Sequence, residues 1–225
     1  MIRAAILLCL LAATAGCGQP ANRGNTQGGA PAATAEGQSS VTAVAEPFEV
    51  LTEQASTINW TAMDNLIANA RAAADGVRAQ IDPSSGGKLD QQLAAIRVAR
   101  RANDRKAIAL AAVEGYRTVV EAQDPATTSP PIPISLLDYA GFRYQALASS
   151  GNVDWPELVR SVAFARQQWS VVGPRIDSPG LRSAFESTLS GMDDAAKSHD
   201  AAYARGAAAT ELALVDTLEE HIARR

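Results

Sequence analysis

Apolar side chains recur at helical spacing along most of the chain from residue 60 onward. In the segment 60–81 they follow one another three or four residues apart: Trp60, Met63, Ile67, Ala70, Ala74, Val77 and Ile81. Residues so spaced form one apolar stripe on a helix, and no segment shows the strict alternation typical of a strand. Alanine, which favours helix, is abundant, and only 5% of the residues are aromatic. The sequence therefore predicts an all-α fold.

Further helical segments are expected, with proline and glycine between them. They cover residues 88–102, 105–123, 155–172, 181–197 and 200–223, with a shorter segment at 135–149. The stretch DPSSGG, residues 82–87, is expected to end the first helix, since proline and glycine interrupt helices. The proline-rich stretch 124–134 is expected to divide the helical body in two.

The sequence of residues 59–82 recurs 95 positions later, in residues 154–177. Seven of the 24 aligned positions are identical: Trp60/Trp155, Ala68/Ala163, Ala70/Ala165, Arg71/Arg166, Val77/Val172, Ile81/Ile176 and Asp82/Asp177. Such landmarks at one nearly constant offset indicate an internal duplication, with one copy in residues 46–123 and the other in 135–223. Neither copy alone would bury its apolar stripes, so we expect both to pack as one antiparallel helical bundle over residues 46–225.

The first 16 residues are organised like a secretory signal peptide. Arg3 supplies a positive charge, and residues 4–13 form an apolar run that is too short to span a membrane, which takes about 20 residues. The sequence ATAGC that follows resembles the lipobox of bacterial lipoproteins, with Thr14 in place of the usual leucine. This resemblance implies that Cys17 is acylated and becomes the N-terminus of the mature protein. Cleavage after Ala15, which would release a soluble periplasmic protein, is the alternative.

Residues 17–45 have the composition of a flexible tether. They are rich in Gly, Ala, Gln, Ser and Pro and contain few large apolar residues, so they cannot bury a core. A lipid anchor, a tether and a folded body form a common bacterial lipoprotein layout. Gly18, rather than aspartate, follows the cysteine, which resembles the sorting signal for the outer membrane. We therefore expect the protein on the periplasmic side of the cell envelope, bound to the membrane by its N-terminal lipid.

Charge and motifs argue against several functions. The formal net charge is −4, or −5 after loss of Arg3, and no basic patch is present, so nucleic acid is not an expected partner. Cys9 lies in the signal peptide, which leaves the mature chain without a disulfide, a cysteine-bound zinc or a thiol nucleophile. The sequence contains no P-loop, Rossmann, HExxH or hydrolase-elbow motif. We therefore do not expect the protein to be an enzyme.

The two histidines are candidate ligand or metal-binding residues. His199 precedes Asp200 in the sequence KSHDAAY, where a turn between helices is expected, with Asp200 as the N-cap. His221 lies in the last turn of the last helix, where a cation interacts favourably with the helix dipole. These structural roles explain both positions, and binding of a ligand or a metal ion by His199, Asp200 and His221 is the alternative.

Five polar side chains placed among apolar ones are candidates for a pocket between helices. They are Glu114, Tyr116, Asp138, Tyr139 and Tyr144. Helical bundles build their binding sites from such side chains on facing helices. The alternative is that the tyrosines are partly buried, with their hydroxyl groups reaching water.

The segment AAIRVARRANDRKAIALAAVEGYRTVVEAQ, residues 94–123, together with the C-terminal HIARR, resembles the periplasmic four-helix cytochromes of the non-covalent b type. In that family a histidine near the end of the last helix binds haem, and the resemblance would give this role to His221. The family's second ligand is a methionine in the first helix, and the corresponding position here is about Leu89, while Met63 and Met192 lie elsewhere. No cofactor is therefore predicted, and haem or a metal ion is the alternative.

The sequence thus predicts a lipid-anchored periplasmic helical bundle with a non-catalytic binding or scaffolding role. A large exposed apolar patch would favour a protein partner. The alternative function is the binding of a small ligand, a metal ion or haem, for which polar side chains should converge on a pocket.

Overall fold

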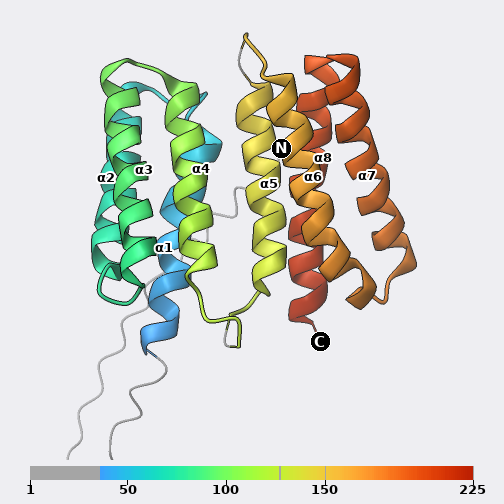
Figure 1. Cartoon of the computed structure of the whole chain (residues 1–225), viewed down its shortest axis with the longest axis horizontal. Coiled ribbons are helices and arrows are strands. Elements are labelled where there is room, and N and C mark those ends of the chain that lie inside the picture. The colour runs from blue at the N-terminus through green and yellow to red at the C-terminus, as the bar shows by residue number, and fades with distance from the viewer. Residues whose placement is uncertain (1–35, 127, 150, 225) are drawn as a thin grey trace, which may run out of the picture. The chain divides into compact units, whose positions relative to one another are not determined.

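The chain forms eight α-helices and no strand in the part that the computed structural model describes, residues 36–224 apart from 127 and 150 (Figure 1). The helices are α1 (Glu36–Gln54), α2 (Trp60–Val77), α3 (Pro83–Arg101), α4 (Arg105–Glu121), α5 (Ile132–Ala148), α6 (Trp155–Val172), α7 (Pro179–Ser198) and α8 (Ala201–Ala223). One turn of 3₁₀ helix, Gly173–Arg175, follows α6. The predicted all-α class is confirmed.

The first helix begins at Glu36, inside the segment whose composition predicts a tether. Buried side chains in its second half are spaced as on one stripe: Val44, Ala45, Phe48 and Leu51. Pro47 lies inside α1 and hides this stripe in the sequence, since proline normally marks a helix boundary. The folded body therefore starts before the predicted boundary at residue 46. The predicted signal peptide, Cys17 and the first part of the tether lie outside the described residues.

The break between α2 and α3 is found at the predicted place. The stretch DPSSGG does not form the loop between these helices, however, but begins α3. Asp82 is the N-cap of α3, and its carboxylate accepts hydrogen bonds from the backbone N–H groups of Ser84 and Ser85 at 2.9 and 3.0 Å. Pro83 occupies the first position of the helix, where its missing N–H is not needed. Both glycines of the stretch also belong to α3, so they do not end a helix here.

The helices pair in the same way in the two halves of the body, α1–α4 and α5–α8. In each half the first helix packs against the second and the fourth, and the third packs against the fourth. The turns before the fourth helices also correspond, because Asn103 and His199 both have a left-handed backbone (φ 55° and 56°) and each precedes an aspartate N-cap. A duplication would produce this correspondence. The duplication itself stays a prediction.

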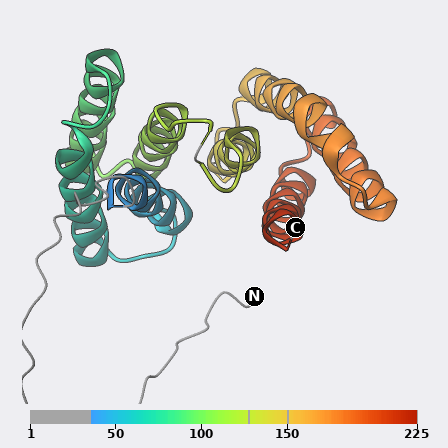
Figure 2. The ribbon, with the colours of Figure 1, turned by 90° about the horizontal axis from the view of Figure 1, so that it is seen from below.

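Helix α5 joins the two halves and is buried on almost every side. It packs against α1 and α4 of the first half and against α6 and α8 of the second. Figure 2 shows α1 and α8 on the same side of α5. Tyr139 and Phe142 belong to the apolar core of the first half, whereas Leu137 and Tyr144 belong to that of the second. Because one helix supplies both cores, the eight helices form one compact unit.

Two glycines allow close approaches between helices. Gly115 of α4 lies against the ring of Phe48 on α1, and a Cβ atom at Gly115 would come within 2.5 Å of the ring's Cε1. Gly141 of α5 lies against Glu211 of α8, and a Cβ atom there would collide with the Glu211 carboxylate. At either position an added Cβ atom would force a neighbouring side chain or helix to shift.

We predict that Gly115→Ala lowers the free energy of unfolding by about 1–3 kcal/mol, because the added methyl group overpacks the α1–α4 contact. Chemical denaturation followed by circular dichroism measures this change. Gly206→Ala is the matched control, since Gly206 is an exposed position of α8 with no atom within 4 Å of an added Cβ. It should stabilise the protein by about 0.5–1 kcal/mol. Equal effects of the two substitutions would contradict the close approach at Gly115.

Candidate functional site

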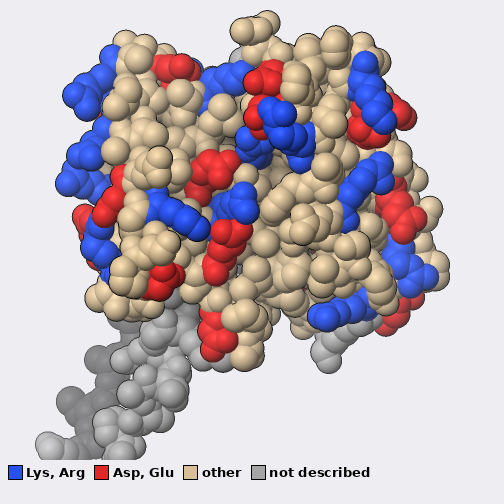
Figure 3. Space-filling view, in the orientation of Figure 1, with Lys and Arg blue, Asp and Glu red and all other residues tan. Residues whose placement is uncertain are grey.

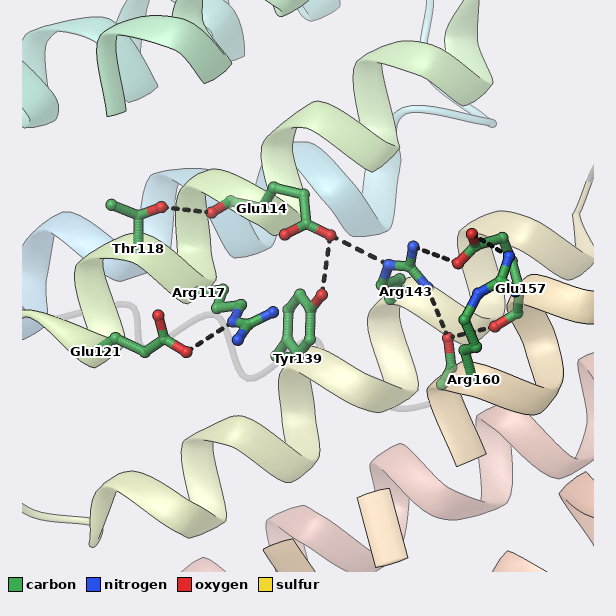
Figure 4. Close-up of polar contacts among 9 residues, drawn as sticks. Glu114, Arg117, Thr118, Glu121, Tyr139, Arg143, Glu157 and Arg160 are labelled. Carbon is green, nitrogen blue, oxygen red and sulfur yellow. Dashed lines mark hydrogen bonds and ion pairs between the residues drawn. The ribbon is translucent and has the colours of Figure 1, made fainter. Parts of the chain in front are cut away.

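A network of polar side chains connects α4, α5 and α6 (Figure 4). Glu114 of α4 is at one end, and its Oε1 accepts hydrogen bonds from the hydroxyl group of Tyr139 at 2.8 Å and from Nε of Arg143 at 3.1 Å. Tyr139 and Arg143 are one turn apart on α5. The predicted pocket residues Glu114 and Tyr139 are therefore in direct contact, and Arg143 joins them although sequence reasoning did not select it.

Arg143 extends the network to α6. It donates to Oγ of Ser161 at 3.0 Å and to Oε2 of Glu157 at 2.7 Å. Glu157 also forms an ion pair with Arg160 on its own helix. Hydrogen bonds from Arg160 and Arg143 lower the pKa of Glu157 from 4.5 to about 2, so it is ionised at neutral pH. Each of the three nitrogens of the Arg143 head group thus donates to an acceptor, Nε to α4 and the other two to α6.

Arg117 of α4 covers the same contact from the side. Its guanidinium lies over the rings of Tyr139 and Phe164, at 5.2 and 5.0 Å from their centroids, and pairs with Glu121. Burial and the neighbouring Glu114 raise the pKa of Tyr139 to about 12, so its hydroxyl keeps its proton. On the side of the molecule that Figure 3 shows, basic and acidic residues are interspersed. The arrangement ties α4, α5 and α6 together and so joins the two halves.

We predict that Arg143→Met lowers the free energy of unfolding by about 2 kcal/mol at pH 7, because Glu114 and Glu157 both lose a charged donor. The pKa of Glu157 is depressed in the folded state, so its ion pairs contribute stability above pH 4.5 that is lost as the pH falls toward 2. The effect of Arg143→Met should therefore shrink in acid. Urea denaturation between pH 2.5 and 7 measures it.

The matched control is Arg166→Met, an exposed arginine on α6. A surface change of this kind should alter the free energy of unfolding by no more than about 0.5 kcal/mol. If both variants lose equal stability, the network does not hold the halves together.

A second polar feature, here called the acidic site, consists of Asp138 on α5 and Glu211 on α8. The side chain of Glu211 is 0% exposed, and neither of its carboxylate oxygens has a hydrogen-bond partner. Its carboxylate fills the space that Gly141 leaves on α5, one turn from Asp138. Burial raises the pKa of Glu211 well above its ordinary value of 4.5 and so favours its protonated, neutral form.

Asp138 lies in a similar environment with several acidic neighbours. Burial raises its pKa well above 3.8, and so do the nearby carboxylates of Glu219, Glu211, Glu49 and Asp216. These neighbours come from α1 and α8, the two helices on the same side of α5 (Figure 2).

Tyr116 of α4 lies beside the acidic site. It is buried, its hydroxyl is hydrogen-bonded to Ser135 of α5, and burial together with Asp138 raises its pKa. The predicted pocket residues Tyr116 and Asp138 are thus neighbours, but they lie apart from the network of Glu114 and Tyr139. Tyr144, the fifth predicted residue, lies in the core of the second half, where its hydroxyl donates to the Met192 carbonyl at 2.7 Å.

We predict that Glu211→Met raises the free energy of unfolding, since methionine fills a similar space without an unpaired polar group. The pKa of Glu211 is raised in the folded state, so the carboxyl costs increasing stability as the pH rises above 4.5. The gain should therefore be larger at pH 8 than at pH 5, by up to about 1.4 kcal/mol per pH unit. Denaturation at both values measures it. Glu186→Met, at an exposed position of α7, should show no such pH dependence.

A cleft of about 480 Å³ lies where α1, α4 and α5 meet. Its lining includes hydroxyl, amide and charged side chains: Thr52, Glu53, Ser56, Arg105, Lys106 and Gln145. Arg105 and Lys106 donate hydrogen bonds to the backbone carbonyls of Ala55 and Asn152, at 2.7 and 2.9 Å, which fixes both basic groups at the rim. Gln145 lies two helical turns from Asp138, on the same face of α5. The volume is within the range of small-molecule sites, roughly 300–1,000 Å³.

The two histidines do not meet. His199 ends α7 in the left-handed conformation, and its ring stacks on Trp155, with 4.8 Å between centroids. Asp200 is the N-cap of α8 and accepts hydrogen bonds from backbone N–H groups. Nε2 of His221 is 2.8 Å from Oδ1 of Asp177. His199 and His221 lie at opposite ends of α8, which are about 33 Å apart at 1.5 Å per residue.

The residues of the chain do not fit haem. His221 contacts Asp177, the position of the second ligand is the buried apolar Leu89, and Met63 and Met192 are buried in the cores of different halves. Among the described residues, no group of three or more His, Cys, Asp or Glu side chains is arranged to hold a metal ion. These positions do not support the haem ligands that the resemblance to b-type cytochromes implies.

No protein-family model matches the chain, and neither a curated protein nor a solved structure is significantly similar to it. Within residues 36–224, leaving out 127 and 150, no helix is long and apolar enough to cross a membrane. The function therefore has to be inferred from the site itself.

Proposed function

We propose that this protein is a non-catalytic binding protein, anchored by the lipid on Cys17 to the periplasmic side of the bacterial cell envelope. Its ligand is a small polar molecule, held in the cleft between α1, α4 and α5. The cleft carries the proposal, because it has the size of a ligand site and gathers hydrogen-bonding groups from both halves of the body. Nucleic acid is not an expected partner of this acidic chain.

The exposed side chains favour a ligand in the cleft over an apolar docking surface for a protein. The large apolar side chains with substantial exposure among the described residues are Val98, Val159, Val171 and Tyr203. They come from three helices, α3, α6 and α8, and single exposed apolar residues are normal on any protein surface.

The ligand can be sought in protein purified from its own cell envelope in a mild detergent. Native mass spectrometry should show a bound small molecule in the wild-type protein. Ser56→Trp, which places a large ring in the cleft from an exposed position, should abolish that extra mass. Ser183→Trp, an exposed position of α7 outside the cleft, is the control and should retain it. A wild-type protein without any bound molecule, or one whose ligand survives Ser56→Trp, would contradict the cleft as the binding site.

We predict that Cys17→Ser moves the protein from the membrane fraction to the soluble fraction, because the acylated thiol is lost. Mass spectrometry of the N-terminal peptide should show acyl chains on the wild-type protein and none on the variant. Cys9→Ser is the matched control and should change neither property, because Cys9 lies within the segment that is removed. Release of the wild-type protein after Ala15 would instead give a soluble periplasmic form and contradict the anchor.

A further inference from the structure

We infer that the acidic site binds one alkylammonium group between the carboxylates of Asp138 and Glu211. This inference rests on the proposed binding role and names a chemical group that the protein recognises. The ammonium group belongs either to a small aliphatic amine or to the lysine side chain of a peptide. Both sources present the same head group on a flexible alkyl stem.

The unpaired carboxylate of Glu211 is the first argument. A buried polar group without a partner costs roughly 1–3 kcal/mol, and native proteins rarely keep one without a use. Both oxygens of Glu211 are enclosed between α5 and α8, in the space that Gly141 leaves open. A donor placed between Glu211 and Asp138 would satisfy both carboxylates at once.

The surroundings of Asp138 are the second argument. Asp138 is 7% exposed and Glu211 is 0% exposed, so Asp138 lies nearer to the surface than Glu211. Glu49 of α1 and Asp216 and Glu219 of α8 lie around it and make the approach negative. These three groups have interactions of their own, so the inference rests on Asp138 and Glu211, and the outer carboxylates add attraction for a cation.

The ligating groups of the acidic site favour an ammonium group over other cations. A metal ion needs three or more ligating groups in suitable positions, and the described residues provide no such set. A guanidinium is a rigid planar fork, whereas an ammonium is compact and carries three donors on a thin stem. Two donors match the carboxylates of Asp138 and Glu211. The hydroxyl pair of Ser135 and Tyr116, beside Asp138, offers an acceptor for the third.

Binding should release protons. In the empty acidic site burial favours the protonated forms of both carboxyls, because it raises their pKa values. The amine enters as R–NH₃⁺, and each carboxyl that pairs with it loses its proton to solvent, so up to two protons leave per ligand. The groups that face Asp138 are Glu49 from α1, Tyr116 from α4, and Glu211, Asp216 and Glu219 from α8.

Isothermal titration of the full chain in neutral detergent tests this inference, with 1,4-diaminobutane as the probe and 1,4-butanediol as its uncharged match. Titration at pH 7 in phosphate and in HEPES separates proton release from binding heat. We expect the diamine to bind with release of at least one proton, binding to tighten from pH 6 to pH 8, and the diol not to bind. A lysine-containing tripeptide, compared with its norleucine counterpart, tests the second source of the ammonium group.

The conservative variants Asp138→Asn and Glu211→Gln should each weaken diamine binding at least tenfold and reduce proton release. Asp194→Asn, an exposed position of α7, is the control and should bind like the wild type. The pH dependence of the wild type keeps the inference testable if a variant fails to fold. The inference is overturned if neither amine binds, if both variants bind normally, or if Ca²⁺ binds through the same two residues instead.

The two proposals fail in different ways. If no amine binds while the wild type still carries a ligand that Ser56→Trp removes, the acidic site is not an ammonium site and the cleft keeps its proposed function. If neither a bound molecule nor amine binding is found, both proposals are wrong.

Discussion

The structure depends on the burial of α5, which contributes to the cores of both halves. Tyr139 and Phe142 pack into the first core, and Leu137 and Tyr144 pack into the second. A helix buried on almost every side has no room for unpaired polar groups, since each would cost free energy. The polar residues of α5 therefore decide how the halves meet, and most of them have partners from neighbouring helices.

Arg143 and Glu211 show two different outcomes of placing charge inside this body. Arg143 is surrounded by acceptors on α4 and α6, so its burial is compensated by hydrogen bonds. Glu211 has no acceptor or donor within reach, and the neighbouring glycine only leaves it space. The unpaired carboxyl of Glu211 lowers the stability of the fold. Binding sites often keep such destabilising groups, so a role in function would explain its presence.

Much of the fold could be predicted from apolar spacing, while its exceptions depended on local chemistry. The stripe beginning at Trp60 identified α2, but Pro47 concealed the stripe of α1. Contact between Glu114 and Tyr139 agrees with their selection as polar residues on facing helices. Sequence reasoning missed Glu211. The sequence did hold a signal, since Glu211 falls on the buried stripe of α8: Ala204, Ala208, Glu211, Val215 and Leu218. That both its oxygens are unpaired depends on the packing against Gly141, which no spacing rule reveals.

The two polar features lie on different sides of α5, and this separation is what makes ligand binding at one of them compatible with the other. Gly141, which receives the Glu211 carboxylate, and Arg143 are two residues apart, so they point about 200° apart around the helix. The side with Arg143 ties α4, α5 and α6 together through paired charges. The side with Asp138 and Gly141 faces α1 and α8 and carries the unpaired acid. A ligand can therefore compensate the acidic side without disturbing the contacts that hold the halves in place.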